Sequence, residues 1–214
     1  MKMNTKRTAQ LLLLFIITSV ASSQELYLEI GKTSSSFDYK NSQGYKLDNL
    51  QATTHNFMTL GYRFSIPIEK LKGSFGVGYM SYGSTGSDNT ITGVMEWNAN
   101  YVELNTSLDY SLFNIKKTSF YIKGMFSTGF LIQGTQSLNS EIINLKNVDD
   151  FNEVMISFKS GAGFLHSVSK ELSFYVQYFF GKSLNQSDNL DYESLRIKSH
   201  NLSFGVLINV LNNR

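Results

Sequence analysis

The sequence predicts an all-β protein, an eight-stranded antiparallel up-and-down transmembrane β-barrel with short periplasmic turns and long extracellular loops. Three observations lead to this prediction. Apolar residues alternate with small, polar or charged residues along about eight segments. The 214 residues include 16 glycines and 28 phenylalanines and tyrosines, but one proline and no cysteine. After an apolar run near the N-terminus, no further stretch is long and apolar enough to form a membrane-spanning helix.

The first 23 residues are expected to form a cleaved signal peptide. Lys2, Lys6 and Arg7 precede an apolar run at residues 11–20, and small residues follow at 21–23. This run is shorter than the roughly 20 residues that a membrane-spanning helix requires. We therefore predict export, cleavage before Gln24, and one mature domain over residues 24–214.

The mature chain gives no electrostatic support to nucleic-acid binding. Loss of the three N-terminal cations leaves 16 basic against 17 acidic residues, so the formal charge changes from +2 to −1. The absence of cysteine excludes disulfides, thiolate metal sites, thiol nucleophiles and a lipidated cysteine anchor. We expect no cofactor and no bound metal, so attachment to a membrane must come from the fold.

The predicted strands share a pattern in which one parity is apolar and the other is small, polar or charged. The last segment is the clearest, although Leu207 breaks its polar parity. Its apolar parity contains Leu202, Phe204, Val206, Ile208 and Val210. The same alternation, with Phe179 as a second exception, predicts strands at residues 26–31, 58–66, 75–79, 102–112, 120–133, 156–164 and 172–183. The even number allows the first strand to pair with the last, which leaves no open sheet edge.

The apolar parity is predicted to face lipid, because the polar parity has the features of a narrow lumen. Nine glycines lie on the polar parity, where a crowded concave interior has little room for side chains: Gly31, Gly61, Gly76, Gly78, Gly129, Gly161, Gly163, Gly181 and Gly205. Balanced charges on the same parity are expected to form a lumenal network: Glu29, Arg63, Glu103, Asp109, Lys123 and Lys159. In the opposite orientation, each lysine or arginine at mid-bilayer would cost about 2–4 kcal/mol.

Seven aromatic residues are predicted to form an interfacial girdle near one set of strand ends. They are Tyr62, Phe64, Phe75, Tyr110, Phe120, Phe164 and Phe174. Connections are expected to alternate between short links at residues 67–72, 114–118 and 169–171 and long loops at 34–52, 83–96, 134–152 and 185–193. Glu141, Asp149 and Asp150 in the third long loop raise the option of a divalent ion or a partner surface.

No sequence motif indicates catalysis. None of His55, His166 and His200 is followed two residues later by serine, as in the eight-stranded lipid A deacylases. A group assembled in space from His200, Ser203 and Glu103 is the catalytic combination that stays open. Transport of large solutes is disfavoured, because side chains fill the interior of an eight-stranded barrel.

Four stretches give the chain a family resemblance: Phe37-Asp38-Tyr39-Lys40-Asn41-Ser42, Leu60-Gly61-Tyr62-Arg63-Phe64, Ile132-Gln133-Gly134-Thr135-Gln136 and Phe204-Gly205-Val206-Leu207-Ile208. Over residues 24–214 the chain resembles small outer-membrane β-barrels of the OmpA/OmpX type, and especially the outer membrane protein β-barrel domain family of Bacteroidetes. The chain departs from many relatives by ending in Asn212-Asn213-Arg214 instead of phenylalanine.

The resemblance implies a non-enzymatic monomer in the cell outer membrane, with a role in envelope integrity, adhesion or surface interaction. Its implied partners are outer-membrane lipid, the barrel-assembly machinery and an extracellular ligand bound through the loops, with no nucleic acid among them. Two alternatives stay open at this point. One is an outer-membrane lipid-modifying enzyme similar to the lipid A deacylases, and the other is a soluble secreted barrel that binds an apolar ligand.

Overall fold

The computed structural model describes residues 24–40, 50–87, 94–138, 141–148, 154–184 and 194–210. The predicted signal peptide and the C-terminal Asn212-Asn213-Arg214 lie outside the described residues, so cleavage before Gln24 stays a prediction. In the described part of the chain, no helix has the length and hydropathy needed to cross a bilayer. The elements there are β1 (Gln24–Lys40), β2 (Gln51–Ser65), β3 (Leu71–Ser87), β4 (Val94–Ile115), β5 (Thr118–Leu138), β6 (Glu141–Asn144), η2 (Leu145–Asn147), β7 (Met155–Ser167), β8 (Leu172–Ser183) and β9 (Ser194–Asn209).

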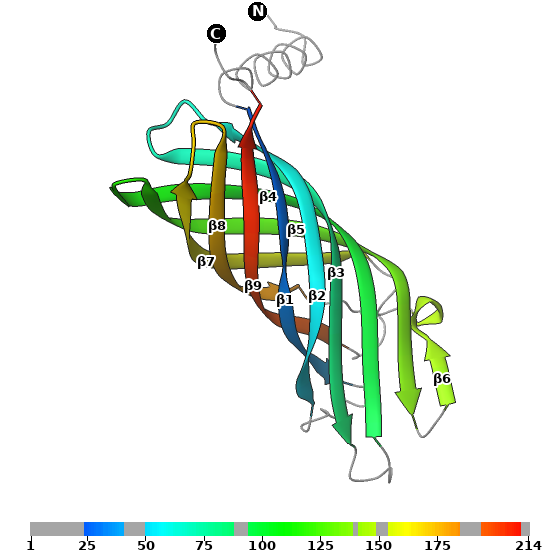
Figure 1. Ribbon diagram of the computed structural model, residues 1–214. Coiled ribbons are helices and arrows are strands. Elements are labelled where there is room, and N and C mark those ends of the chain that lie inside the picture. Colours follow the sequence, from blue (N-terminus) through cyan, green and yellow to red (C-terminus); the bar gives the residue numbers. More distant parts are fainter. Residues whose placement is uncertain are drawn as a thin grey trace, which may run out of the picture.

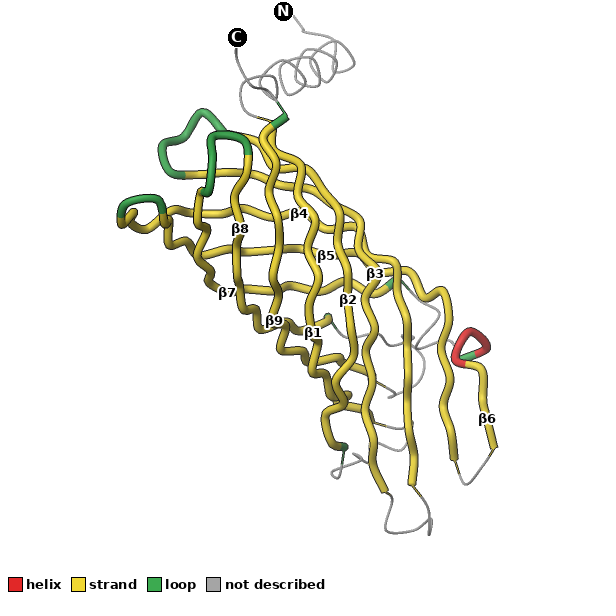
Figure 2. The backbone as a smooth tube through the Cα atoms, viewed as in Figure 1, coloured by secondary structure: helices red, strands yellow, loops and turns green. Residues whose placement is uncertain are grey.

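Eight of the described strands close into one antiparallel barrel (Figures 1 and 2). The order around the wall is β4-β3-β2-β1-β9-β8-β7-β5, and pairing of β4 with β5 completes the ring. The first and last strands pair continuously from Glu25 opposite Asn209 to Lys40 opposite Ser194. A closed ring satisfies the backbone hydrogen bonds between its strands and leaves no edge facing lipid. The predicted eight-stranded up-and-down barrel is confirmed.

The short connections lie at the same end of the barrel as the start of β1 and the end of β9 (Figure 1). Residues 66–70 join β2 to β3, residues 116–117 join β4 to β5, and residues 168–171 join β7 to β8. Lys70 and Lys116 take positive φ angles of 64° and 54° in two of these turns. The short links predicted around Pro67, Lys116 and Lys170 are therefore confirmed.

The strands are much longer than predicted. β4 spans 22 residues and β5 spans 21, whereas a strand crosses a bilayer in about 9–11 residues. The loops predicted at residues 34–52, 83–96 and 134–152 are correspondingly too long, because β1 continues to Lys40, β3 to Ser87 and β5 to Leu138. Within the third of these loops, the chain also forms β6 against the end of β5, followed by η2.

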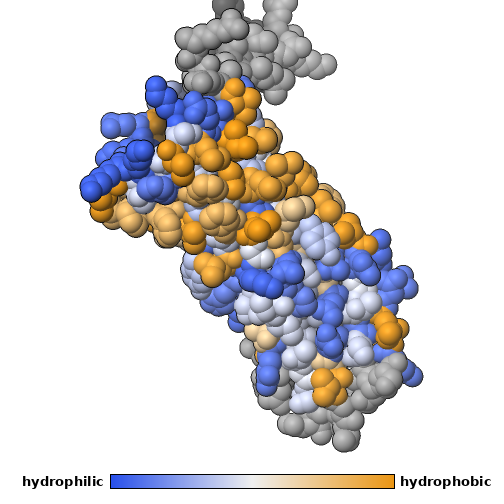
Figure 3. Space-filling view, viewed as in Figure 1, coloured by the Kyte–Doolittle hydropathy of each residue, from blue (hydrophilic) through white to orange (hydrophobic). Residues whose placement is uncertain are grey.

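The apolar parity faces outward next to the short turns and forms a band that we call the lipid belt (Figure 3). Phe204 is 46% exposed and Leu202 57%, whereas Arg63 and Glu103 on the other parity are 7% and 0% exposed. Belt residues from the eight ring strands include Leu28, Leu60, Val77, Leu104, Phe126, Phe158, Phe180 and Leu202. The predicted orientation is confirmed, and the alternative of a soluble barrel with an apolar interior is excluded.

The predicted aromatic girdle lies near the strand ends that the short turns join. Tyr62 and Phe75 face each other across β2 and β3, with ring centroids 5.5 Å apart. Phe120 and Phe164 do the same across β5 and β7, at 6.3 Å. Aromatic rings favour the membrane–water boundary, so these pairs indicate where the belt ends on the short-turn side.

Beyond the lipid belt, the polarity of the two strand faces is reversed. In β4 the inward side chains change from Glu103 and Asn105 to Trp97 and Tyr101, while the outward ones change from Leu104 to Asn100 and Asn98. No residue is inserted at this point of β4, so the two faces of β4 keep their parity and exchange only their chemistry. On the neighbouring β5, Ile132 is an extra residue opposite Asn100 and Tyr101. We call the part of the barrel beyond this reversal the outer section (residues 33–40, 51–57, 80–87, 94–101, 131–138 and 194–200).

The outer section is filled by an apolar core. Its buried side chains include Phe37, Phe57, Tyr82, Trp97, Tyr101, Leu131, Leu195 and Ile197, and Leu145 of η2 and Met155 of β7 belong to the same core. Leu145 comes from η2, which folds back over the barrel from the end of β6, and its side chain is fully buried. The outside of this section faces water instead of lipid, so the hydrophobic effect drives apolar groups inward.

Lumenal glycines at the level of the belt make room for aromatic rings. A methyl group added at Gly205 would overlap the ring of Tyr175, and one added at Gly61 would overlap that of Tyr27. These rings and Leu207 form a small buried cluster at this level. The two exceptions to the alternation, Leu207 and Phe179, are thereby explained as inward-facing apolar residues that are 4% and 2% exposed.

We predict that Gly205→Ala lowers the stability of the barrel by about 1–3 kcal/mol, because the new methyl group overpacks the lumen. Gly124→Ala is the matched control, since its added methyl would come no closer than 3.8 Å to Phe158. Urea unfolding of both variants in lipid vesicles measures the difference. Equal midpoints for the two variants would show that the lumen yields at Tyr175.

Candidate functional site

A row of charged residues crosses the inside of the barrel on five consecutive strands, β1 to β5. Glu25, Arg63, Lys72, Asp109 and Lys123 occupy neighbouring positions on these strands. The register places Glu25 opposite Arg63, Lys72 opposite Asp109, and Asp109 opposite Lys123. Strand register alone therefore brings together side chains that are up to about a hundred residues apart in the sequence.

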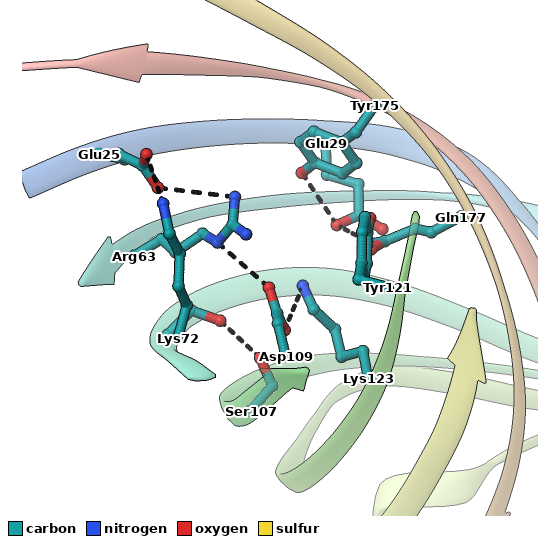
Figure 4. Close-up of polar contacts among 11 residues, drawn as sticks. Glu25, Glu29, Arg63, Lys72, Ser107, Asp109, Tyr121, Lys123, Tyr175 and Gln177 are labelled. Carbon is teal, nitrogen blue, oxygen red and sulfur yellow. Dashed lines mark hydrogen bonds and ion pairs between the residues drawn. The ribbon is translucent and has the colours of Figure 1, made fainter. Parts of the chain in front are cut away.

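The charges of this row form one continuous network (Figure 4). The Arg63 guanidinium lies between two carboxylates, with its Nε 3.2 Å from Asp109 Oδ2 and its Nη1 3.5 Å from Glu25 Oε2. Asp109 also pairs with Lys123 through Oδ1 and Nζ at 3.3 Å. Lys72 Nζ donates to Glu25 Oε1 at 2.9 Å.

A separate ion pair, between Lys159 and Glu103, lies further from the short turns, where the lumen changes from polar to apolar. Lys159 Nζ donates to Glu103 Oε2 at 2.6 Å, and the side chains are 4% and 0% exposed. The Tyr82 hydroxyl donates to the other oxygen of Glu103 at 2.5 Å. Glu103 thus lies at the boundary between the charged lumen and the apolar core of the outer section.

Glu29 differs from the other predicted members because its partners are neutral. Gln177 Nε2 donates to Glu29 Oε2 at 2.8 Å, and the Tyr175 hydroxyl donates to the same oxygen at 3.3 Å. Tyr121 in turn donates to Gln177 Oε1 at 2.9 Å. No ion pair joins Glu29 to a cation among the described residues, so hydrogen bonds hold this buried carboxylate in place.

The structure therefore brings five of the six predicted residues into ion pairs and gives the sixth a hydrogen-bonded setting. The sequence pattern did not identify Glu25 and Lys72. Glu25 has the same parity as Glu29 on β1, and Lys72 has the same parity on β3 as Ser74, which lies opposite Arg63. Extending the alternation by one residue before Leu26 would have identified Glu25, and extending it by three residues before Phe75 would have identified Lys72. With them the lumen holds four described carboxylates and four described cations, a balance that limits the charge left unpaired in a low-dielectric interior.

Little free space is left between these side chains. The cavity bordered by Tyr27, Arg63, Tyr121, Tyr175 and Leu207 has a volume of about 10 Å³, near the minimum that can accommodate a single water molecule. Side chains therefore fill the lumen at the level of the lipid belt, as expected for a ring of eight strands. Chemically, the network is suited to holding the barrel walls together.

The catalytic group considered from the sequence does not form. His200 is exposed on the outer wall, whereas Ser203 and Glu103 are buried in the lumen. The barrel wall separates the imidazole from the other two side chains. His166 contacts Thr118 and His55 contacts Thr53, in each case through one hydrogen bond to a hydroxyl.

Candidate metal ligands do not gather in the described part of the chain, where no group of three or more histidine, aspartate or glutamate side chains is placed to hold an ion. Glu141 is an exposed residue of β6. Asp149 and Asp150 lie outside the described residues, so the option of a divalent ion in this loop stays a prediction.

Comparison with known proteins gives matches by structure alone. No family model and no curated protein matches the chain. The solid-state NMR structure of the outer membrane protein AlkL in lipid bilayers matches with a TM-score of 0.50 and 12% identity, over 90% of this chain and 92% of that one. Neisserial surface protein A matches with a TM-score of 0.48 and 12% identity, over 86% and 96%. The attachment invasion locus protein Ail of Yersinia pestis gives 0.41 and 14%, over 86% and 98%.

The match to AlkL shows that the chain has the fold of an outer-membrane β-barrel. The predicted resemblance to small barrels of the OmpA/OmpX type is confirmed at the level of fold, whereas no match supports the Bacteroidetes family. A closed barrel with an apolar belt is also one of the few structures that a bilayer accepts. The fold and the belt together place the protein in the outer membrane, in contact with its lipid.

We predict that Lys159→Met destabilises the barrel by about 3–5 kcal/mol, because it leaves the fully buried Glu103 without a cation. Lys123→Met should have a clearly smaller effect, since Asp109 keeps its ion pair with Arg63. Urea unfolding midpoints in lipid vesicles test this order, with the exposed Lys182→Met as control. An equal or greater loss in Lys123→Met would contradict the described network.

Proposed function

We propose that the protein is a non-enzymatic, non-conducting outer-membrane anchor whose outer section presents a binding surface to partners outside the cell. The observation that carries this proposal is the continuation of the barrel beyond the lipid belt as a section with an apolar core of its own. A protein needed only to occupy the bilayer would require about 9–11 residues per strand. The additional length of β1 to β5 has no purpose inside the membrane.

The construction of the outer section favours a fixed surface. Its interior is packed with large side chains, among which Tyr82 and Tyr101 meet edge to face with ring centroids 5.9 Å apart. Ser35 also ties β1 to β3, because Gly83 N donates to its Oγ at 2.8 Å and the same hydroxyl donates to Gly83 O at 3.0 Å. Packed interiors of this kind deform little, and a surface held in one shape binds with a smaller loss of conformational entropy.

A small cavity lies among the buried side chains of the outer section. Phe37, Trp97, Leu195 and Val148 line this cavity of about 80 Å³, with the amide of Gln136 as a polar neighbour. Trp97 is the only tryptophan in the sequence, so its fluorescence reports on this place alone.

The first prediction from this proposal concerns conductance. Because charged and aromatic side chains fill the lumen at Arg63 and Glu103, the folded protein should produce no stable current steps in planar lipid bilayers. A known porin reconstituted in the same bilayers is the control. A reproducible single-channel conductance would contradict the closed lumen and would favour a transport function.

The second prediction concerns cells. A deletion strain is expected to attach less to coated surfaces or to other cells than its parent, whereas its resistance to detergents and bile salts stays unchanged. The deletion strain expressing the protein from a plasmid should recover the parental attachment. Unchanged attachment together with sensitivity to detergents would contradict a surface-binding role and would favour envelope integrity.

A further inference from the structure

An apolar groove of about 610 Å³ crosses the outer wall over β2, β1, β9 and β8. Its apolar lining comes from Ile30, Val176, Leu202 and Phe204. Lys32 and Asn56, which are neighbours across β1 and β2, line the same groove. The groove thus joins lipid-facing side chains to a cation and an amide.

The register places this groove at the outer boundary of the lipid belt. Ile30 pairs with Met58 and Phe204, which are all exposed apolar residues of the belt. One outward position further from the short turns, Lys32 pairs with Asn56 and Leu202. On the face over β8, β9, β1 and β2, hydrophobic side chains give way to hydrophilic ones about midway along the barrel (Figure 3). Lys32 therefore lies at the depth of the lipid headgroups of the outer leaflet.

Three further cations lie on the outer wall just beyond this boundary. Lys182 is directly opposite Lys198 on β8 and β9, and Arg196 follows on β9. Together with Lys32 they form what we call the basic face. Like charges that face each other across two strands repel, so an anion bound between Lys182 and Lys198 would relieve their repulsion.

Few described acidic side chains are placed to neutralise these cations. Asp38 lies opposite Arg196 and pairs with Lys198 Nζ at 3.4 Å. No ion pair is formed by Lys32, Lys182 or Arg196 with the described residues. Counting only residues that the structure describes, four cations and one carboxylate give the basic face a formal charge of +3. Its chemistry is complementary to phosphate, which arginine binds as a planar fork and lysine as a point charge.

We propose that the groove and the basic face together form a binding site for a phosphorylated glycolipid of the outer leaflet, of the lipid A type. One acyl chain lies in the groove against Leu202 and Phe204, and a phosphate lies above it between Lys32, Lys182 and Lys198. His200 lies between these elements, because it pairs with Phe180 on β8 and with Ser34 on β1. Its ring contacts Phe180, and Tyr178 Oη lies 2.5 Å from its Nδ1. The imidazole is thereby held against the belt, beside the phosphate position.

The test measures lipid binding to the full mature chain in detergent micelles by native mass spectrometry. The probes are bis-phosphorylated lipid A, its dephosphorylated derivative and inorganic phosphate. We expect one tightly bound bis-phosphorylated lipid A, with at least tenfold weaker binding of the dephosphorylated lipid and no retained inorganic phosphate. Equal affinity for the two lipids would overturn the proposal, as would a second copy of the chain in place of the lipid.

The triple variant Lys32→Gln, Lys182→Gln, Lys198→Gln should bind lipid A at least tenfold more weakly than the unchanged protein. A control with the same change of charge elsewhere, Lys117→Gln, Lys146→Gln, Lys170→Gln, should retain the affinity to within twofold. Both proteins should keep the same urea unfolding midpoint, which separates lost binding from lost folding. Equal losses of affinity in the two triple variants would show that net charge alone attracts the lipid and would overturn the site.

A second pair of variants tests the groove separately from the cations. Leu202→Trp fills the groove with an apolar ring and should weaken lipid A binding several-fold. Leu104→Trp makes the same change in the lipid belt on β4, outside the groove, and should leave the affinity unchanged. Unchanged binding in Leu202→Trp would show that no acyl chain lies in the groove.

Discussion

The outward side chains of each strand must match the medium that surrounds the barrel at that height, and most other features of the protein follow from this constraint. Inside the bilayer the medium is hydrocarbon, so Leu104 and Phe204 face out and the strands pair with one another in a closed ring. Beyond the bilayer the medium is water, so Asn98 and Asn100 face out on the same strand as Leu104. The same strands are therefore compatible with lipid and with water, because the apolar side chains lie on the outer face in the bilayer and on the inner face beyond it.

The interior carries the consequences of this exchange. At the level of the belt the outward positions hold the apolar residues, so charged and aromatic side chains fill a narrow space between walls of small residues. Glycines such as Gly205 and Gly61 admit the rings of Tyr175 and Tyr27, and carboxylates lie beside cations. In the outer section the interior is apolar, and Leu145 closes over it from a segment between β5 and β7. The Glu103–Lys159 pair marks the change from one interior to the other.

These two halves suit different tasks. The belt half has a filled lumen, and the barrel wall separates the exposed His200 from the buried Ser203 and Glu103. The outer half projects a packed surface over a small cavity at Trp97. Between them, at the height of the lipid headgroups, lie the groove and the basic face. Lipid recognition at this boundary and partner recognition further out are therefore compatible on one chain.

The sequence by itself determined the number of ring strands, the side of each strand that faces lipid and the positions of the short turns. Alternation with a period of two is a local property, because neighbouring side chains of a strand point to opposite faces. The sequence predicts strands that are too short, because the apolar parity that indicates a strand changes side beyond Val102 in β4 and at Lys32 in β1.

Only the tertiary structure decided which charges meet, and why. Strand register places Asp109 between Arg63 and Lys123, and directs Glu29 to Gln177 and Tyr175 instead of a cation. Register depends on hydrogen bonds between strands that are far apart in the chain, such as β1 and β9. The same long-range pairing gathers Lys32, Lys182, Arg196 and Lys198 on one face of the barrel. No local pattern contains that information, because it arises only when the ring closes.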